Sequence, residues 1–264
     1  MRTLLLVWVL AAAAMTAGWL WQRQHHNAGI VDVLWAASLA AAALLCALLG
    51  TGAPVPRLLL AACGGTWGVR LARHLWQRVH GEPEDGRYRY LRGLWHGDQR
   101  RWFALFQFQA LLVVLFAVPF VIVAGNQATR PVWLAAALLI FCGSLAGETV
   151  ADAQLARFRA APANRGRTCR AGLWRYSRHP NYFFEWLHWF SYVALAAGTP
   201  HAWAALLGPL AMYAFLRWVS GIPFTEAQAL RTRGDDYRHY QQCTSMLFPW
   251  PPRRPPTDPL RSRP

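Results

Sequence analysis

Gly172-Leu-Trp-Arg-Tyr-Ser-Arg-His-Pro-Asn-Tyr-Phe-Phe-Glu-Trp-Leu-His-Trp189 joins a basic segment to an apolar, aromatic run. Pro180 suits the first turn of a helix, because the N–H that proline lacks would have no intrahelical partner there. On that helix Asn181, Glu185 and His188 are spaced i, i+4 and i+7 and share one face. The segment therefore predicts an apolar helix with one polar stripe, which suits a polar ligand group such as a carboxamide.

The rest of the chain shares this apolar character. Its 264 residues are 55% hydrophobic and 15% charged, whereas soluble proteins average roughly 45–50% and about 25%. This composition excludes a disordered chain, a coiled coil and a disulfide scaffold. A membrane span needs about 20 apolar residues. Seven runs approach that length: Leu4–Trp21, Ala28–Gly50, Leu58–Trp76, Trp102–Gly125, Val132–Val150, Tyr182–Gly198 and Ala202–Ile222.

The positive charge is distributed unevenly among the segments between these runs. The net charge is +15, and Arg78–Arg101 holds six arginines, Arg157–Arg178 seven and the tail seven. These basic segments alternate with nearly neutral ones. By the positive-inside rule we expect an all-α, seven-span protein of a bacterial inner membrane, with the N-terminus outside and the C-terminus in the cytoplasm. The alternative for the first run is a cleaved signal peptide, which would shift the orientation of the loops.

The expected organisation is a single membrane domain over residues 1–249, whose C-terminal half from about residue 131 carries the cofactor site, followed by a disordered Pro/Arg-rich tail, 250–264. Five scattered cysteines without a CxxC pair predict neither a metal site nor a disulfide framework. No soluble nucleotide-binding motif occurs. Gly64-Gly65-Thr-Trp-Gly68 predicts close helix packing.

Several acidic residues lie in or beside the apolar runs, where an ionisable group usually has a polar cavity and a task. Glu148, Asp152 and Arg159 form a second stripe on the helix before the quoted segment. The alternative for this stripe is a surface ladder of ion pairs. After the last run, the segment from Glu226 to Arg233 predicts an amphipathic helix stopped by Gly234.

Gly172-Leu-Trp-Arg-Tyr-Ser-Arg-His-Pro-Asn-Tyr with Glu185 resembles the C-terminal domain of the steroid 5-alpha-reductase family. The similarity extends over Glu148 and Asp152 and the tail pattern Glu226…Gly234-Asp-Asp-Tyr237…Tyr240…Thr244…Phe-Pro249. Trp67-Gly68-x-Arg70-Leu with Arg73 is similar to the third helix of the bacterial branch. Sterol reductases and isoprenylcysteine carboxyl methyltransferase share the Arg-His-Pro-x-Tyr core, and Asn181 with Glu185 favours the reductases.

The resemblance implies seven transmembrane helices and NADPH held from the cytosolic side. By position, Asn181 and Glu185 would contact the nicotinamide, Asp152, Arg159 and Arg167 the ribose and phosphates, and Glu226 and Tyr237 the cofactor clamp. The expected cofactor-binding set is Glu148, Asp152, Arg159, Arg167, Tyr176, Arg178, His179, Asn181, Glu185, Glu226 and Tyr237, with no metal.

The implied reaction is reduction of a conjugated carbon–carbon double bond. It needs an acid that hydrogen-bonds the developing enolate and a proton donor, and the candidates are Asp32, His74, Tyr88 and Tyr90. The Gln-Glu pair of animal steroid reductases is absent from Thr51-Gly-Ala-Pro-Val-Pro56, so the expected substrate is a steroid-like enone or another conjugated lipid.

Two other functions remain open at this stage. One is an S-adenosylmethionine-dependent membrane methyltransferase, whose cofactor carries no phosphate. The other is a non-catalytic lipid-binding or assembly protein. None of the three predicts nucleic acid or an obligate protein as a partner.

Overall fold

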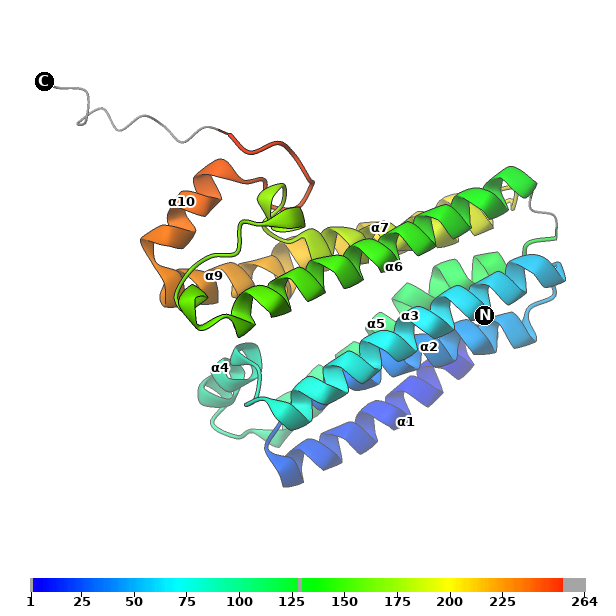
Figure 1. Cartoon of the computed structure of the whole chain (residues 1–264). Helices are drawn as coiled ribbons and strands as arrows, with labels where there is room; N and C mark the ends of the chain where they lie inside the picture. Colours follow the sequence, from blue (N-terminus) through cyan, green and yellow to red (C-terminus); the bar gives the residue numbers. More distant parts are fainter. Residues whose placement is uncertain (1, 128–129, 254–264) are drawn as a thin grey trace, which may run out of the picture. The chain divides into compact units, whose positions relative to one another are not determined.

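The computed structural model describes residues 2–127 and 130–253, and every regular element in these two ranges is helical (Figure 1). The all-α prediction is therefore confirmed. The α-helices are α1 Arg2–His25, α2 Ile30–Leu49, α3 Pro54–Gly81, α4 Gly86–Trp95, α5 Gln99–Ala124, α6 Pro131–Ala160, α7 Pro180–Ala196, α8 Leu207–Ala214, α9 Ile222–Arg233 and α10 Asp235–Cys243. Short 3-10 turns span Pro162–Asn164, Gly172–Arg175 and Ala202–Leu206, and a π turn spans Phe215–Val219.

The predicted membrane runs fall largely within helices. Within the described residues, five helical stretches are long and apolar enough to cross a membrane: α1, α2, α5, α6 and Ala202–Arg233. Helix α7 has only 17 residues, and α3 carries the cations Arg57, Arg70, Arg73 and Arg78. The architecture is consistent with a multi-pass membrane protein.

The chain divides into two compact units. Unit 1 consists of residues up to Phe141 together with Trp189–Ala211, and unit 2 consists of Cys142–His188 and the chain from Met212 onwards. The chain passes from one unit to the other within α6, α7 and α8. Of the predicted disordered tail, residues 254–264 lie outside the described residues.

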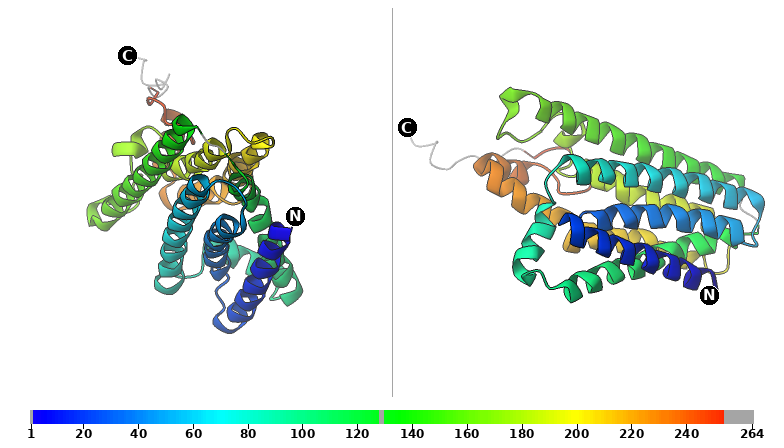
Figure 2. Two further views of the ribbon diagram at one scale, coloured as in Figure 1. Left: turned by 90° about the vertical axis from the view of Figure 1, so that its right-hand side faces the viewer. Right: turned by 90° about the horizontal axis from the view of Figure 1, so that it is seen from below.

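Unit 1 is a bundle of helices with an aromatic core. Helices α1, α2, α3 and α5 lie side by side, as Figures 1 and 2 show. Trp189 is fully buried. Its ring lies 4.8 Å from that of Phe116 and 5.6 Å from that of Trp67, centroid to centroid. Large aromatic side chains in such tilted and edge-on contacts bury much apolar area, so this cluster is the centre of the unit.

Two glycines allow α2 and α3 to approach closely, as the Gly64–Gly68 motif predicts. A Cβ atom on Gly64 would lie 2.5 Å from the Cβ of Ala43, and one on Gly68 would lie 2.9 Å from the carbonyl oxygen of Ala36. Real Cβ atoms essentially never come this close to such atoms. The prediction of close helix packing is therefore confirmed at both positions.

Unit 2 contains the second half of α6, the first half of α7, and α9 with α10. Helix α7 begins at Pro180 as predicted. Gly147 of α6 packs on Phe184 of α7, since a Cβ on this glycine would meet the phenyl ring at 2.4 Å. Helix α9 ends at Gly234, whose φ of 52° favours a residue without a Cβ. The predicted stop signal is confirmed.

The helix of residues 207–219 ends in a π turn. The N–H of Ser220 donates to the carbonyl oxygen of Phe215 at 2.9 Å, five residues back rather than four. Gly221 follows, and Pro223 stands at the start of α9, where its missing N–H costs no hydrogen bond.

We expect Gly68→Ala to lower the free energy of unfolding by about 1–3 kcal/mol, because the new methyl group meets backbone that cannot move aside. Gly65→Ala is the matched control, since its Cβ would lie at an ordinary 3.6 Å from the nearest atom, on Leu44. Thermal unfolding of the detergent-solubilised variants measures both. Equal melting temperatures for the two variants would contradict the close approach of α2 and α3.

Candidate functional site

Polar side chains line the facing sides of α6 and α7 in unit 2. The Asn181 side-chain N–H donates to Oδ1 of Asp152 at 3.2 Å. Since Gly147 packs on Phe184, the two helices run antiparallel. One helical turn from the Asp152–Asn181 contact, Glu148 on α6 and Glu185 on α7 therefore lie at the same level of the pair.

Both of these glutamates are buried, with 8% of Glu148 and 9% of Glu185 exposed. Buried carboxylates are rare in proteins and are retained where they are hydrogen-bonded or have a task. The structure thus brings four of the predicted cofactor residues, from two sequence-distant stripes, onto one helix pair. We call Glu148, Asp152, Asn181 and Glu185 the polar ladder.

The segment before α7 is held against α6 by side-chain hydrogen bonds. Gln154 Oε1 accepts from the backbone N–H of Leu173 at 2.9 Å, and the indole N–H of Trp174 donates to the carbonyl oxygen of Ala151 at 2.9 Å. Gly172, with φ of 59°, passes so close to Gln154 that a Cβ would clash at 2.4 Å. These contacts fix the position of the arginine-rich segment between α6 and α7 along α6.

A second polar cluster surrounds Glu226 on α9. Its Oε1 accepts from Arg178 Nε at 2.7 Å, from His179 Nε2 at 3.2 Å and from the Tyr237 hydroxyl at 3.3 Å. Its Oε2 accepts from Gln241 Nε2 at 2.8 Å. Four donors from the loop before α7 and from α10 thus converge on one carboxylate. The cluster joins three of the predicted cofactor residues to Glu226.

Arg178 also holds the segment after α10. Its Nη1 donates to the carbonyl oxygens of Gln241 and Thr244, each at 2.9 Å, and its backbone N–H donates to Ser245 O at 2.8 Å. The guanidinium has five N–H donors, so its Nη2 group is the part left for a ligand. Arg178 therefore acts first as a structural bridge.

The other predicted cofactor residues lie at the surface of unit 2. Arg159 and Arg167 are exposed, and Tyr176 is 42% exposed while its carbonyl oxygen accepts from the N–H of Trp250. Guanidinium groups remain charged at all relevant pH values and bind phosphate oxygens through paired hydrogen bonds. Arg159 lies on α6, the helix that carries Glu148 and Asp152, and both arginines are accessible to an anionic ligand.

A family model described as "Protein of unknown function (DUF1295)" matches residues 18–244. The chain belongs to this family. The match includes both the polar ladder and the Glu226 cluster. No curated protein and no solved structure matches the chain.

The residues predicted as catalytic in this DUF1295 protein lie in unit 1, where two of the candidates, Asp32 and Tyr88, contact each other. The Oδ2 of Asp32 accepts from Arg87 Nη2 at 3.0 Å, and its Oδ1 accepts from the Tyr88 hydroxyl at 2.8 Å. These bonds hold α4 against the start of α2. Tyr88 is itself 5% exposed, and burial raises the pKa of its hydroxyl well above the usual value.

Helix α4 is further fixed by its own cap. Asp85 Oδ1 accepts from the backbone N–H of Arg87 at 2.9 Å, the usual role of an N-terminal aspartate. Burial raises the pKa of Asp85, but the charge and hydrogen bonds of Arg87 outweigh it and hold this pKa below its usual value. Tyr90 on α4 is 64% exposed and His74 on α3 is exposed. A catalytic role for these two residues stays a prediction.

Several residues that build the site are not evident from the sequence. Gln241 completes the Glu226 cluster, Gln154 fixes the loop before α7, and Ser177 Oγ donates to Leu247 O at 2.7 Å. Only Gln241 had a detectable signal, since it lies four residues after Tyr237 and so shares its helix face. The others act through contacts between distant segments.

The pH dependence of stability should report on His179. Burial lowers the pKa of this imidazole more than its hydrogen bond to Glu226 raises it. The unfolded chain therefore binds the proton more readily than the folded one. Stability should be highest above the unfolded value of about 6.5 and should fall as the pH drops through the folded pKa.

We expect His179→Gln to weaken this loss of stability, measured as melting temperature between pH 7.5 and pH 5. The matched control is His201→Gln, at an exposed histidine, which should leave the profile unchanged. A His179→Gln profile as steep as that of the wild type would contradict a neutral, buried His179.

A second expectation concerns Asp32. We expect Asp32→Asn to lower the free energy of unfolding by about 1.5–3 kcal/mol, the range for hydrogen bonds to a charged group. Asp235→Asn is the control, because that side chain is 94% exposed beside Arg238; it should change stability by less than about 0.5 kcal/mol. Denaturant unfolding in detergent measures both, and an Asp32→Asn protein as stable as the control would contradict the docking role.

Proposed function

We propose that this chain is a membrane-embedded, NADPH-dependent reductase of a conjugated carbon–carbon double bond in a lipid-soluble substrate, similar to the steroid 5-alpha-reductases. The observation that carries the proposal is the polar ladder, because it gathers three carboxylates and an amide on one apolar helix pair in a membrane protein. Ionisable residues at membrane depth usually face a polar cavity and mark a functional site.

The donor set of unit 2 fits a phosphorylated dinucleotide. An amide side chain has two N–H donors and two acceptor lone pairs. Asn181 uses one donor on Asp152 and one acceptor position for the N–H of Tyr182, so it keeps one of each for a carboxamide. Carboxylates such as Asp152 accept from ribose hydroxyls, and the exposed Arg159 and Arg167 suit phosphate oxygens.

Bound in this way, NADPH would supply a hydride to the polarised double bond. The work of the chain itself is to orient and to exclude water. Asn181 and Glu185 fix the orientation of the carboxamide from one face of α7, and the aromatic residues of α7 keep the site dry. Loss of water strengthens every hydrogen bond to the charge that develops on the substrate.

We further propose that the chain crosses a bacterial inner membrane seven times, with the N-terminus outside and the C-terminal tail in the cytoplasm. This topology is supported by the alternation of arginine-rich and nearly neutral segments and by the helical state of the predicted runs. On this topology the arginines between α6 and α7 face the cytoplasm, where the nucleotide is available.

We expect NADPH to raise the melting temperature of the solubilised protein by several degrees, since a ligand at about a hundredfold its Kd stabilises by about 2.7 kcal/mol. Glu185→Gln should remove most of this shift, because it replaces the carboxyl group by an amide of nearly the same shape and so alters the hydrogen bonds offered to the carboxamide. The control is Glu82→Gln, at an exposed glutamate in unit 1, which should keep the full shift. Arg167→Glu should weaken NADPH binding by at least about tenfold.

S-adenosylmethionine provides the opposing measurement. A clear shift with this cofactor and none with NADPH would replace the reductase by the methyltransferase. No response to either cofactor, in the wild type and in all variants, would favour a non-catalytic lipid-binding protein.

A further inference from the structure

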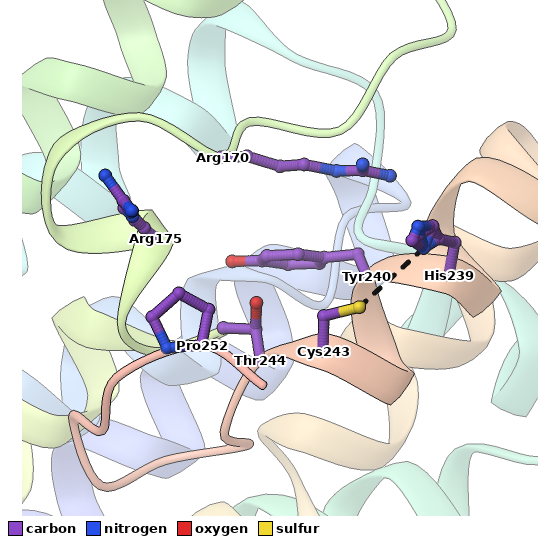
Figure 3. A pocket seen from close by; sticks show the side chains of 7 residues that line it. All are labelled: Arg170, Arg175, His239, Tyr240, Cys243, Thr244 and Pro252. Carbon is purple, nitrogen blue, oxygen red and sulfur yellow. Dashed lines mark hydrogen bonds between the residues drawn. The ribbon is translucent and has the colours of Figure 1, made fainter. Parts of the chain in front are cut away.

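Exposed arginines can meet negative charge in a pocket or along a surface, and the two cases differ in geometry. At the end of α10, Arg170 and Arg175 line a pocket of about 300 Å³, but they lie at opposite ends of the Tyr240 side chain (Figure 3). Cations that diverge in this way do not share one small anion. A membrane surface sets no such condition, because each cation on it can meet a separate lipid headgroup.

Of these two arginines, Arg170 has a partner within the chain. Its Nη2 donates to Oδ1 and to the backbone oxygen of Asp236 at 2.7 Å each. The Oδ2 of Asp236 in turn accepts from the N–H of Thr168 at 2.7 Å. Arg170 therefore joins α10 to the segment between α6 and α7, whereas Arg175 is exposed without such a bond among the residues that the structure describes.

Helix α4 of unit 1 lies where arginines can meet a membrane surface. It is found at the end of the bundle at which α1 and α3 end and α2 and α5 begin (Figure 1). In the right-hand view of Figure 2 it runs across this end of the bundle. Helices α1, α2 and α5 are long and apolar enough to cross a membrane. In a multi-pass protein a helix across the ends of such spans lies in the plane of the interface.

The inner face of α4 is held by carboxylates of unit 1. The contacts of Asp32 described above fix its first turn. Further along, Arg92 Nη2 donates to Glu84 Oε1 at 2.7 Å, and this oxygen also accepts from the N–H of Ala28 at 2.7 Å. The Arg92 guanidinium lies 4.9 Å from the ring centroid of Trp102, which is fully buried. The cations of this face are therefore used within the chain, and the opposite face has a fixed direction.

The outer face of α4 combines apolar and basic side chains. Tyr90 is 64% exposed and Leu94 is 53% exposed, and their spacing of four residues makes them neighbours on the helix. Arg89 is exposed as well, and no carboxylate pairs with it within the described part of the chain. Tyrosine and arginine beside an apolar side chain are typical of a membrane interface, where aromatic rings lie at the level of the headgroups.

The first turn of α5 extends this surface. Arg100 is exposed, and in residues 2–127 and 130–253 its guanidinium forms no ion pair. The side chain of Arg101 is 59% exposed, and its Nε lies 3.4 Å from Oδ2 of Asp98. An exposed pair of this kind contributes little to stability, so Arg101 is accessible to another anion. We call Arg89, Tyr90, Leu94, Arg100 and Arg101 the α4–α5 surface.

We propose that the α4–α5 surface binds the headgroups of anionic phospholipids. Arg89 and Arg100 meet headgroup phosphates, and Tyr90 and Leu94 reach the boundary with the acyl chains. The positive charge selects an anionic partner, and the exposed Leu94 distinguishes a lipid from a soluble anion, which would leave this side chain in water. The inference does not rest on the reductase function, because α4 belongs to unit 1 and the polar ladder to unit 2.

A photo-crosslinking amino acid in place of Leu94 tests the partner directly. The full chain is placed in nanodiscs of equal parts phosphatidylglycerol and phosphatidylcholine, and the crosslinked peptides are identified by mass spectrometry. We expect attachment to phospholipid, with phosphatidylglycerol at least about threefold preferred. The control is the same probe in place of Leu139, which is 74% exposed on the candidate span α6 and should attach to both lipids alike.

Two variants test the cations separately. Arg89→Gln and Arg100→Gln should each lower the preference for phosphatidylglycerol at position 94, and the double variant should reduce it to the value at position 139. The matched control is Arg130→Gln, at an exposed arginine beyond the opposite end of α5, which should keep the wild-type preference. High salt should weaken the preference of the wild type, because exposed charges are screened.

Three results would overturn the proposal. The probe at position 94 could attach to no lipid, it could attach to the two lipids in the same ratio as the probe at position 139, or the double variant could keep the wild-type preference. Attachment to a second copy of the chain in place of lipid would likewise overturn it and would assign the α4–α5 surface to a protein contact.

Discussion

A carboxylate enclosed among apolar helices is stable only where hydrogen-bond donors surround it, and unit 2 is organised by this requirement at Glu226. Side chains from the loop before α7 and from α10 supply the donors. Because Arg178 and His179 directly precede Pro180, the same contacts position the first turn of α7. The face that carries Asn181 and Glu185 therefore depends on a carboxylate more than 40 residues further along the chain.

The charged groups discussed above fall into two classes, according to whether they form several hydrogen bonds within the chain. Glu226, Asp236 and Asp32 accept hydrogen bonds from several groups of the chain and hold segments together. Arg159, Arg167 and Arg175 lie at the surface without such a fixed task. The sequence contains no lysine, so every cation of the second class is a planar group suited to paired hydrogen bonds with phosphate. This separation supports the proposal that unit 2 binds a phosphorylated cofactor.

Local patterns predicted much of the fold. The start of α7 at Pro180, the end of α9 at Gly234 and the close packing at Gly64 and Gly68 each depend on neighbouring residues, so the sequence shows them directly. The i, i+4 spacing likewise identified both stripes of the polar ladder. That the two stripes lie together was implied only by the resemblance. The contact of Gly147 with Phe184 sets the distance between α6 and α7, and no pattern in either helix reveals this contact.

What could not be predicted are the contacts made when the chain returns on itself. Arg178 was expected to face a cofactor, yet most of its donors go to Glu226 and to the backbone after α10. Asp32 also accepts from Arg87 and Tyr88, which no sequence pattern indicates, and its role as an acid stays a prediction. Both residues have the chemistry expected of a site. Tertiary structure alone decides which groups these two side chains contact.

The π turn at Phe215–Val219 bears on how this protein can vary. Such a turn holds one residue more than the α-helical turn it replaces. A homologue shorter by one residue at this point can therefore replace the π turn by an α-helical turn and leave the break at Ser220 and Gly221 before α9 in place. Single-residue gaps in an alignment should be placed at this turn rather than inside either flanking helix.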